Sequence, residues 1–133
     1  MDKEIKNLLL SDLCARLPYG VKVNNEIQGD FTVYGICENF IYGRNEVCHI
    51  DFAVEKIKPY LFPLSSMNEE QKKEYNRWKH DVPVCYYEYG DVVEKIELLD
   101  SPESFEYLIE NHFDYRGLID KGLAIDATGK NIY

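Results

Sequence analysis

Residues 111 to 120, NHFDYRGLID, gather the side chains of this chain that are best suited to acid–base chemistry. His112 and Asp114 stand two positions apart, and Arg116 follows two positions later. A histidine can transfer a proton near neutral pH, a carboxylate can orient the imidazole, and an arginine can hold an anionic oxygen. A set of His112, Asp114 and Arg116 would therefore suit the hydrolysis of a phosphoester.

Folding offers a second explanation for the same residues. Asp114 is placed to cap a short helix over residues 115 to 121, by accepting from the amide of Arg116 or Gly117. His112 would end the preceding helix, where exposed carbonyls favour a partly protonated imidazole. Catalysis would also require a nucleophile or a metal ion, and the run does not supply one. We favour the folding interpretation and predict no catalytic residue.

The remaining histidines give no support to a metal site. His49 and His80 each stand far from the candidate run. His49 directly follows Cys48, but adjacent residues of a strand point to opposite faces of the sheet. The sequence also contains none of the short motifs of nucleotide-binding loops, serine hydrolases or zinc proteases. We therefore predict no metal and no cofactor.

The chain is acidic, and its acidity is concentrated in one segment. It has 24 acidic and 15 basic residues, which give a formal net charge of −9. Eight acidic residues fall between Glu88 and Glu110, against the single base Lys95. Such a surface repels phosphate backbones and anionic membranes, so direct binding of nucleic acid is disfavoured. It keeps the protein soluble, docks a basic partner or imitates a phosphate backbone.

Tyrosine is abundant, with 11 residues, and three tyrosines stand beside acids in CYYEYGD, where the acidic segment begins. A tyrosine ring packs at the boundary of a core or contributes to a binding surface, and in both cases its hydroxyl needs a polar partner. We predict a protein-binding surface in this segment. Its residues are Tyr87, Glu88, Tyr89, Asp91, Glu94, Glu97 and Glu103.

The hydrophobic pattern predicts one α+β domain over residues 1–133. Residues 3–17 are predicted to form a helix with one buried stripe, because helical spacing relates their apolar side chains Ile5, Leu8, Leu9, Leu13 and Leu17. Several later segments alternate apolar and polar residues, and this pattern predicts a small antiparallel sheet of four or five strands, partly barrel-like. Further helices are expected over residues 67–79, 102–111 and 115–121.

Two local predictions concern the second half of the chain. Ser66 and Glu69 have the spacing of a capping box at the start of the helix over 67–79. Residues 83 to 99 fit either a helix or two strands joined by a turn at Gly90-Asp91. We favour the hairpin.

The four cysteines are widely separated and form no C-x-x-C pair, so we expect reduced thiols that mostly fill the core. Charges interrupt the first 20 residues, which predict neither a signal peptide nor a membrane span. A cytoplasmic protein that does not bind membranes is the resulting expectation.

Three stretches resemble a family of short uncharacterised proteins found in gut Bacteroides-type bacteria and in their phages and mobile elements. They are DLCARLPYGVKV, IKPYLFPLSSMNEEQKKEY and NHFDYRGLIDKGLAIDATGKNIY. The resemblance brings no assigned activity and no catalytic residues. It implies a bacterial cytoplasm, or the host cytoplasm for a phage protein, and an accessory role in a mobile element. The positions that it marks as a family signature are Pro59, Ser66, His112, Asp114, Tyr115, Arg116 and Gly117.

Two functional hypotheses follow. The first is a non-enzymatic interaction or regulatory protein of phage or mobile-element type, which binds a protein partner through its acidic, tyrosine-rich surface. A purely scaffolding role would leave the same pattern in the sequence. The alternative is a small phosphoester hydrolase with a site around His112, Asp114 and Arg116.

Overall fold

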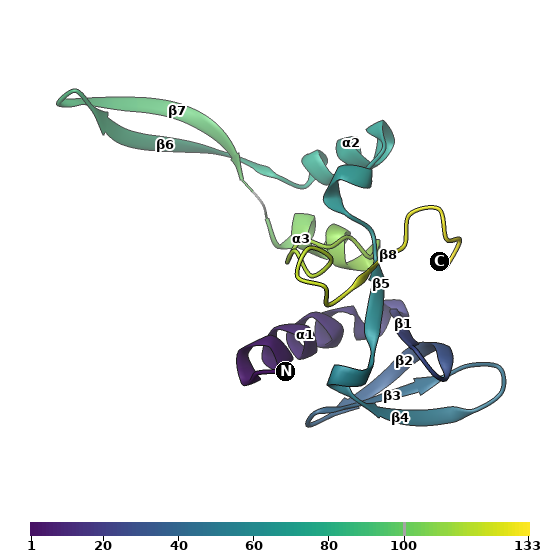
Figure 1. The fold of residues 1–133 in the computed structure, drawn as a ribbon. Coiled ribbons are helices and arrows are strands. Elements are labelled where there is room, and N and C mark those ends of the chain that lie inside the picture. Colours follow the sequence, from purple (N-terminus) through teal and green to yellow (C-terminus); the bar gives the residue numbers. More distant parts are fainter. Residues whose placement is uncertain (100) are drawn as a thin grey trace. The chain divides into compact units, whose positions relative to one another are not determined.

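The computed structural model describes residues 1–99 and 101–133, without the side chains of residues 80–87 and 93–99. It is an α+β structure with an N-terminal helix, a mostly antiparallel sheet and later helices, as predicted (Figure 1). Two compact units are distinguished and are described separately. The first comprises Met1–Ser66 and Ile109–Tyr133, and the second comprises Met67–Leu108. The prediction of a single domain stays a prediction.

The first unit begins with helix α1, Lys3–Arg16, close to the predicted range. Asp2 caps it, because its Oδ1 accepts from the Ile5 amide at 2.9 Å. Leu9 and Leu13 are fully buried and form the centre of the predicted stripe. No helix in the described part of the chain is long and apolar enough to cross a membrane.

A six-stranded sheet forms the rest of this unit, in the order β4-β3-β2-β1-β5-β8. Its neighbouring strands are antiparallel except β5 and β8, which are parallel. The sheet is not closed into a barrel. Its strands are β1 Lys22–Asn25, β2 Gly29–Cys37, β3 Phe40–Arg44, β4 His49–Ala53, β5 Lys58–Leu61 and β8 Ile125–Asp126.

The core lies between α1 and one face of this sheet. Alternate residues of β2, Phe31 and Val33, are buried, and they share one cluster with Leu9 and Leu13. The prediction that the cysteines fill the core is wrong for Cys14, Cys37 and Cys48, which are exposed free thiols. They occupy the polar side of their elements, because larger aliphatic and aromatic side chains already fill the interior. The side chain of Cys85 lies outside the described residues.

The second unit contains helices α2, Glu69–Arg77, and α3, most of Pro102–Glu110. The capping box of α2 is formed by Asn68 and Gln71, so the predicted box of Ser66 and Glu69 is wrong. The Ser66 hydroxyl instead donates to the Pro63 carbonyl at 2.6 Å, inside a short 3-10 turn that delays the start of the helix. Ser101 caps α3, since its Oγ accepts from the Ser104 amide at 3.1 Å.

Strands β6, His80–Glu88, and β7, Asp91–Leu99, form a two-stranded hairpin in the second unit (Figure 1). The hairpin interpretation of this segment is therefore confirmed. The turn lies at Tyr89-Gly90, one residue earlier than predicted. Its φ angles of 52° and 87° are those of a type I′ turn, whose twist matches the twist of paired strands.

Residues 115 to 121 form consecutive turns, so the prediction of a helix there is wrong. Gly117 has φ +72°, which interrupts any right-handed helix in the middle of the segment. Asp114 also accepts from amides further along the chain than those of a helical first turn. These contacts hold the segment as a compact loop.

Candidate functional site

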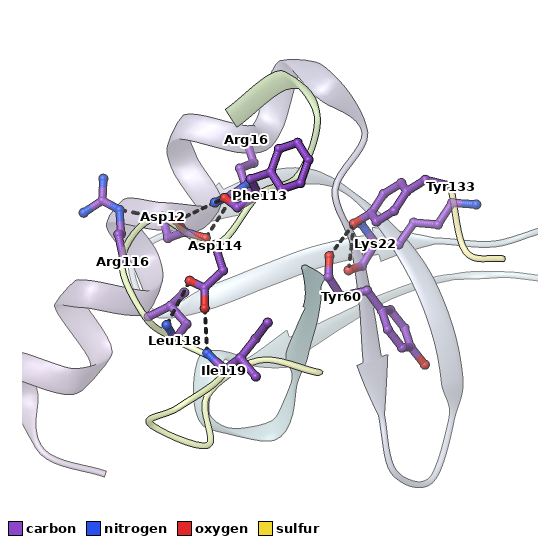
Figure 2. A network of polar contacts seen from close by, with 10 residues as sticks. All are labelled: Asp12, Arg16, Lys22, Tyr60, Phe113, Asp114, Arg116, Leu118, Ile119 and Tyr133. Carbon is purple, nitrogen blue, oxygen red and sulfur yellow. Dashed lines mark hydrogen bonds and ion pairs between the residues drawn. The ribbon is translucent and has the colours of Figure 1, made fainter. Parts of the chain in front are cut away.

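A buried ion pair on α1 lies in a polar network that includes two of the candidate catalytic residues, Asp114 and Arg116 (Figure 2). Asp12 and Arg16 are both 0% exposed and stand one helical turn apart. Arg16 Nε donates to Asp12 Oδ2 at 2.8 Å, and Nη2 donates to Oδ1 at 3.2 Å. A buried ion pair is tolerated only when close geometry and further hydrogen bonds offset its desolvation.

Those further contacts come from the segment that follows α3. Arg16 Nη2 also donates to the Phe113 carbonyl at 2.5 Å. Arg116 brings its Nε within 3.3 Å of Asp12 Oδ1 and remains 27% exposed. One buried carboxylate is therefore shared by two guanidinium groups, and the network ties residues 113–116 to α1.

Asp114 organises the loop from within. Its Oδ1 accepts from the Leu118 amide and its Oδ2 from the Ile119 amide, each at 2.9 Å (Figure 2). Its own amide donates to the Phe62 carbonyl at 2.8 Å. Two amides from the loop thus satisfy both oxygens of a carboxylate that is only 7% exposed.

His112 is buried in a left-handed backbone conformation, with φ +63°. Its ring stacks on the Tyr133 ring, with centroids 3.6 Å apart and planes 11° from parallel. Burial lowers the pKa of His112 to about 4, and the nearby positive charges of Arg16 and Lys22 act in the same direction. The imidazole is therefore neutral at neutral pH, and its buried Nδ1 has no hydrogen-bond partner among the described residues.

Tyr133 links two strands of the sheet through its hydroxyl (Figure 2). The hydroxyl accepts from the Lys22 amide of β1 at 2.8 Å and donates to the Tyr60 carbonyl of β5 at 2.9 Å. The paired register ends at Val23 and Pro59, so Lys22 and Tyr60 would be the next pair. The Tyr133 hydroxyl therefore extends the pairing of β1 with β5 by one position. Burial raises the pKa of Tyr133 to about 12.

The three candidate catalytic side chains have different partners. The His112 ring contacts Tyr133, the Asp114 carboxylate holds loop amides, and Arg116 pairs with Asp12. A shallow hollow beside the loop includes Asp114 among its lining residues, but neither His112 nor Arg116. These contacts support a folding role, and the hydrolase hypothesis stays a prediction without a shared site to carry it.

Sequence reasoning missed Asp12, Arg16 and Tyr133 as members of this network. A signal for the first two was present, because both fall within the apolar stripe of α1 at a separation of four residues. A charged pair of opposite sign inside a buried stripe predicts a buried ion pair. Nothing near Tyr133 in the sequence indicates its partner Lys22, which lies 111 positions away.

The predicted binding residues lie mostly on the hairpin. Glu88, Tyr89 and Asp91 are exposed around its turn, and Glu103 is exposed on α3. The backbone register places Tyr87, Glu94 and Glu97 opposite Val92, Cys85 and Val82. The side chains of Tyr87, Glu94 and Glu97 lie outside the described residues.

Tyr89 has a conformation that folding alone does not favour. Its φ of 52° is left-handed, a region that costs an ordinary residue about 1–2 kcal/mol relative to glycine. Asparagine, aspartate and glycine are the preferred residues at this position of a type I′ turn. Packing does not offset the cost, because Tyr89 is 98% exposed.

Comparison with models of protein families, with curated proteins and with solved structures finds no match to this chain. The resemblance to proteins of gut bacteria and their phages stays a prediction.

Proposed function

We propose that this protein is a non-enzymatic binding protein, and that the tip of hairpin β6–β7 contacts a basic surface of a partner protein. The observation that carries the proposal is Tyr89, a fully exposed aromatic residue in a backbone conformation that disfavours it. An unfavourable local conformation that brings no packing indicates a function outside the fold. Contact with a partner would give this ring the burial that it lacks.

The surroundings of Tyr89 fit a protein interface. Val92, three positions further along the chain, is 62% exposed, and the exposed residues Glu88 and Asp91 flank the turn. Tyrosine is among the residues that contribute most to binding when a partner covers them. Exposed acids of one sign steer a positively charged partner toward the site and reject acidic ones.

The resemblance to phage and mobile-element proteins suggests where the partner would be found. A partner in the bacterial cytoplasm would be a host or mobile-element protein with a basic patch. Regulation by occupying that patch is the role we propose for the acidic tip.

The substitution Tyr89→Asn separates binding from folding. Asparagine followed by Gly90 is a preferred type I′ pair, so the variant is expected to gain about 1 kcal/mol of stability. Removal of the ring is expected to weaken partner binding by about 2 kcal/mol, or roughly thirtyfold. Urea unfolding measures the stability, and a pull-down from bacterial lysate followed by titration of the retained protein measures the binding.

A charge reversal with a matched control tests the acidic component. Glu88→Lys with Asp91→Lys should abolish retention of the partner, whereas Glu26→Lys with Glu46→Lys should preserve it. Both pairs are exposed and change the net charge equally. The proposal is wrong if Tyr89→Asn and the tip reversal retain the same proteins as the unchanged chain.

A further inference from the structure

The turn of hairpin β6–β7 determines which backbone groups point inward. In a type I′ hairpin the residues that flank the turn, here Glu88 and Asp91, exchange both of their hydrogen bonds. Hydrogen-bonded and non-hydrogen-bonded pairs then alternate along an antiparallel ladder. The non-hydrogen-bonded pairs are therefore Tyr87–Val92, Cys85–Glu94, Pro83–Ile96 and Asp81–Leu98. The backbone amides and carbonyls of these residues point away from the hairpin.

Pro83 makes the two outer edges of the hairpin unequal. It occupies a non-hydrogen-bonded pair with Ile96, so its missing N–H removes no bond between β6 and β7. The missing donor is instead on the outer edge of β6. A proline at such a position is a common protection against pairing with another strand.

The outer edge of β7 has no such protection. The sequence from Asp91 to Leu99 contains no proline, and the backbone amides and carbonyls that point outward are those of Val92, Glu94, Ile96 and Leu98. No third strand pairs with β6 or β7 in the part of the chain that the structure describes. A two-stranded hairpin is only marginally stable in water, and a third strand would stabilise it.

We infer that the outer edge of β7 accepts an extended basic segment of the partner protein as a third strand. This inference rests on the proposed function and adds the mode of binding to it. Main-chain hydrogen bonds would supply affinity, as in other cases of strand addition. The partner segment should be basic because β7 contributes Asp91, Glu94 and Glu97 against Lys95 alone. A second copy of this chain fits less well, since it would bring another net charge of −9.

Amide hydrogen exchange can test the inference with a defined probe, a capped peptide of alternating lysine and valine. Binding should slow hydrogen exchange by about tenfold or more at four outward-pointing amides, those of Val92, Glu94, Ile96 and Leu98. The amides of Val93, Lys95 and Glu97 already lie in the ladder and should change little. A peptide of alternating lysine and proline has the same charge but cannot form the ladder, and it should produce no such pattern.

Two proline substitutions provide a matched control on the protein. Ile96→Pro removes an outward donor from β7, and Cys85→Pro removes one from β6 at an equivalent non-hydrogen-bonded position. Ile96→Pro should weaken binding of the lysine–valine peptide by about tenfold or more, and Cys85→Pro should leave it unchanged. Slow hydrogen exchange at the Val93 and Val84 amides, which bond across the hairpin, would show that each variant keeps the hairpin.

The outcomes distinguish this inference from the proposed function. If both peptides bind equally and the outward amides of β7 do not slow, strand addition is wrong, while an acidic binding surface remains. If Ile96→Pro and Cys85→Pro weaken binding equally, the edge of β7 is not the site. If neither peptide binds, strand addition by a basic segment is also wrong, and the Tyr89→Asn pull-down decides the proposed function separately.

Discussion

Replacing His112 tests how burial of its neutral imidazole links stability to pH. Asparagine is the substitution of choice, because it tolerates the left-handed conformation of this position and carries no titrating group. The variant loses the stacking contact with Tyr133 at every pH. Its particular effect is on how stability changes with pH.

The sign follows from the lowered pKa of His112. The unfolded chain binds a proton at this residue below an ordinary pKa of 6.5, whereas the folded chain binds it only below about 4. The stabilisation is therefore complete above about pH 6.5 and is lost as the pH falls toward 4. Linkage gives a loss of about 2 kcal/mol between neutral pH and about pH 5.

Urea unfolding of the unchanged chain and of His112→Asn, followed by circular dichroism, measures this loss. Carboxylates also titrate in the same range, but they are common to both proteins and cancel in the difference. The unchanged chain should lose about 2 kcal/mol more than the variant between neutral pH and about pH 5. Proton NMR of the His112 ring gives its pKa in the folded state directly.

Two parallel stability curves would refute this reasoning. Parallel curves would mean that His112 has the same pKa in both states, and that its imidazole is open to water in the folded protein. A folded-state pKa near 6.5 by NMR would lead to the same conclusion.

Two further predictions concern the loop and the sheet. Asp114→Ala should destabilise the fold by about 2–3 kcal/mol in urea unfolding, because the Leu118 and Ile119 amides lose their acceptors; a loss below about 0.5 kcal/mol, the size expected for a surface substitution, would contradict this role. Gly43→Ala should cost about 1–3 kcal/mol, because the new methyl group would lie 2.9 Å from Phe31 Cβ. Gly35→Ala is the control, since its methyl group would meet Tyr42 at 3.7 Å, an ordinary contact, and equal losses at the two glycines would show that this clash is relieved.

Local patterns in the sequence were sufficient for most of the secondary structure. The stripe of α1, the cap of α3 by Ser101 and the alternation of β2 each depend on residues a few positions apart. Local rules failed where two short-range signals competed. Both Ser66 and Asn68 can cap a helix, and the contact of Ser66 with Pro63 decided between them.

The candidate site was only partly accessible to the same reasoning. The sequence identified Asp114 as a residue that satisfies backbone amides, and the structure gives it that role with different amides. The sequence also identified the acidic segment, and the residues of that segment at the hairpin turn, Glu88, Tyr89 and Asp91, are exposed. It did not identify the unfavourable conformation of Tyr89, because the turn was expected one residue later.

The sequence by itself determined the α+β class and the concentration of negative charge, and it favoured the hairpin over a helix, because periodicity and turn chemistry act over a few residues. Only the tertiary structure decided the partners of the buried polar groups. Arg16 donates to Phe113 across 97 positions, and Tyr133 reaches Lys22 across 111. Such pairs form because burial requires each polar group to find a partner, and which partner is within reach depends on how the whole chain folds.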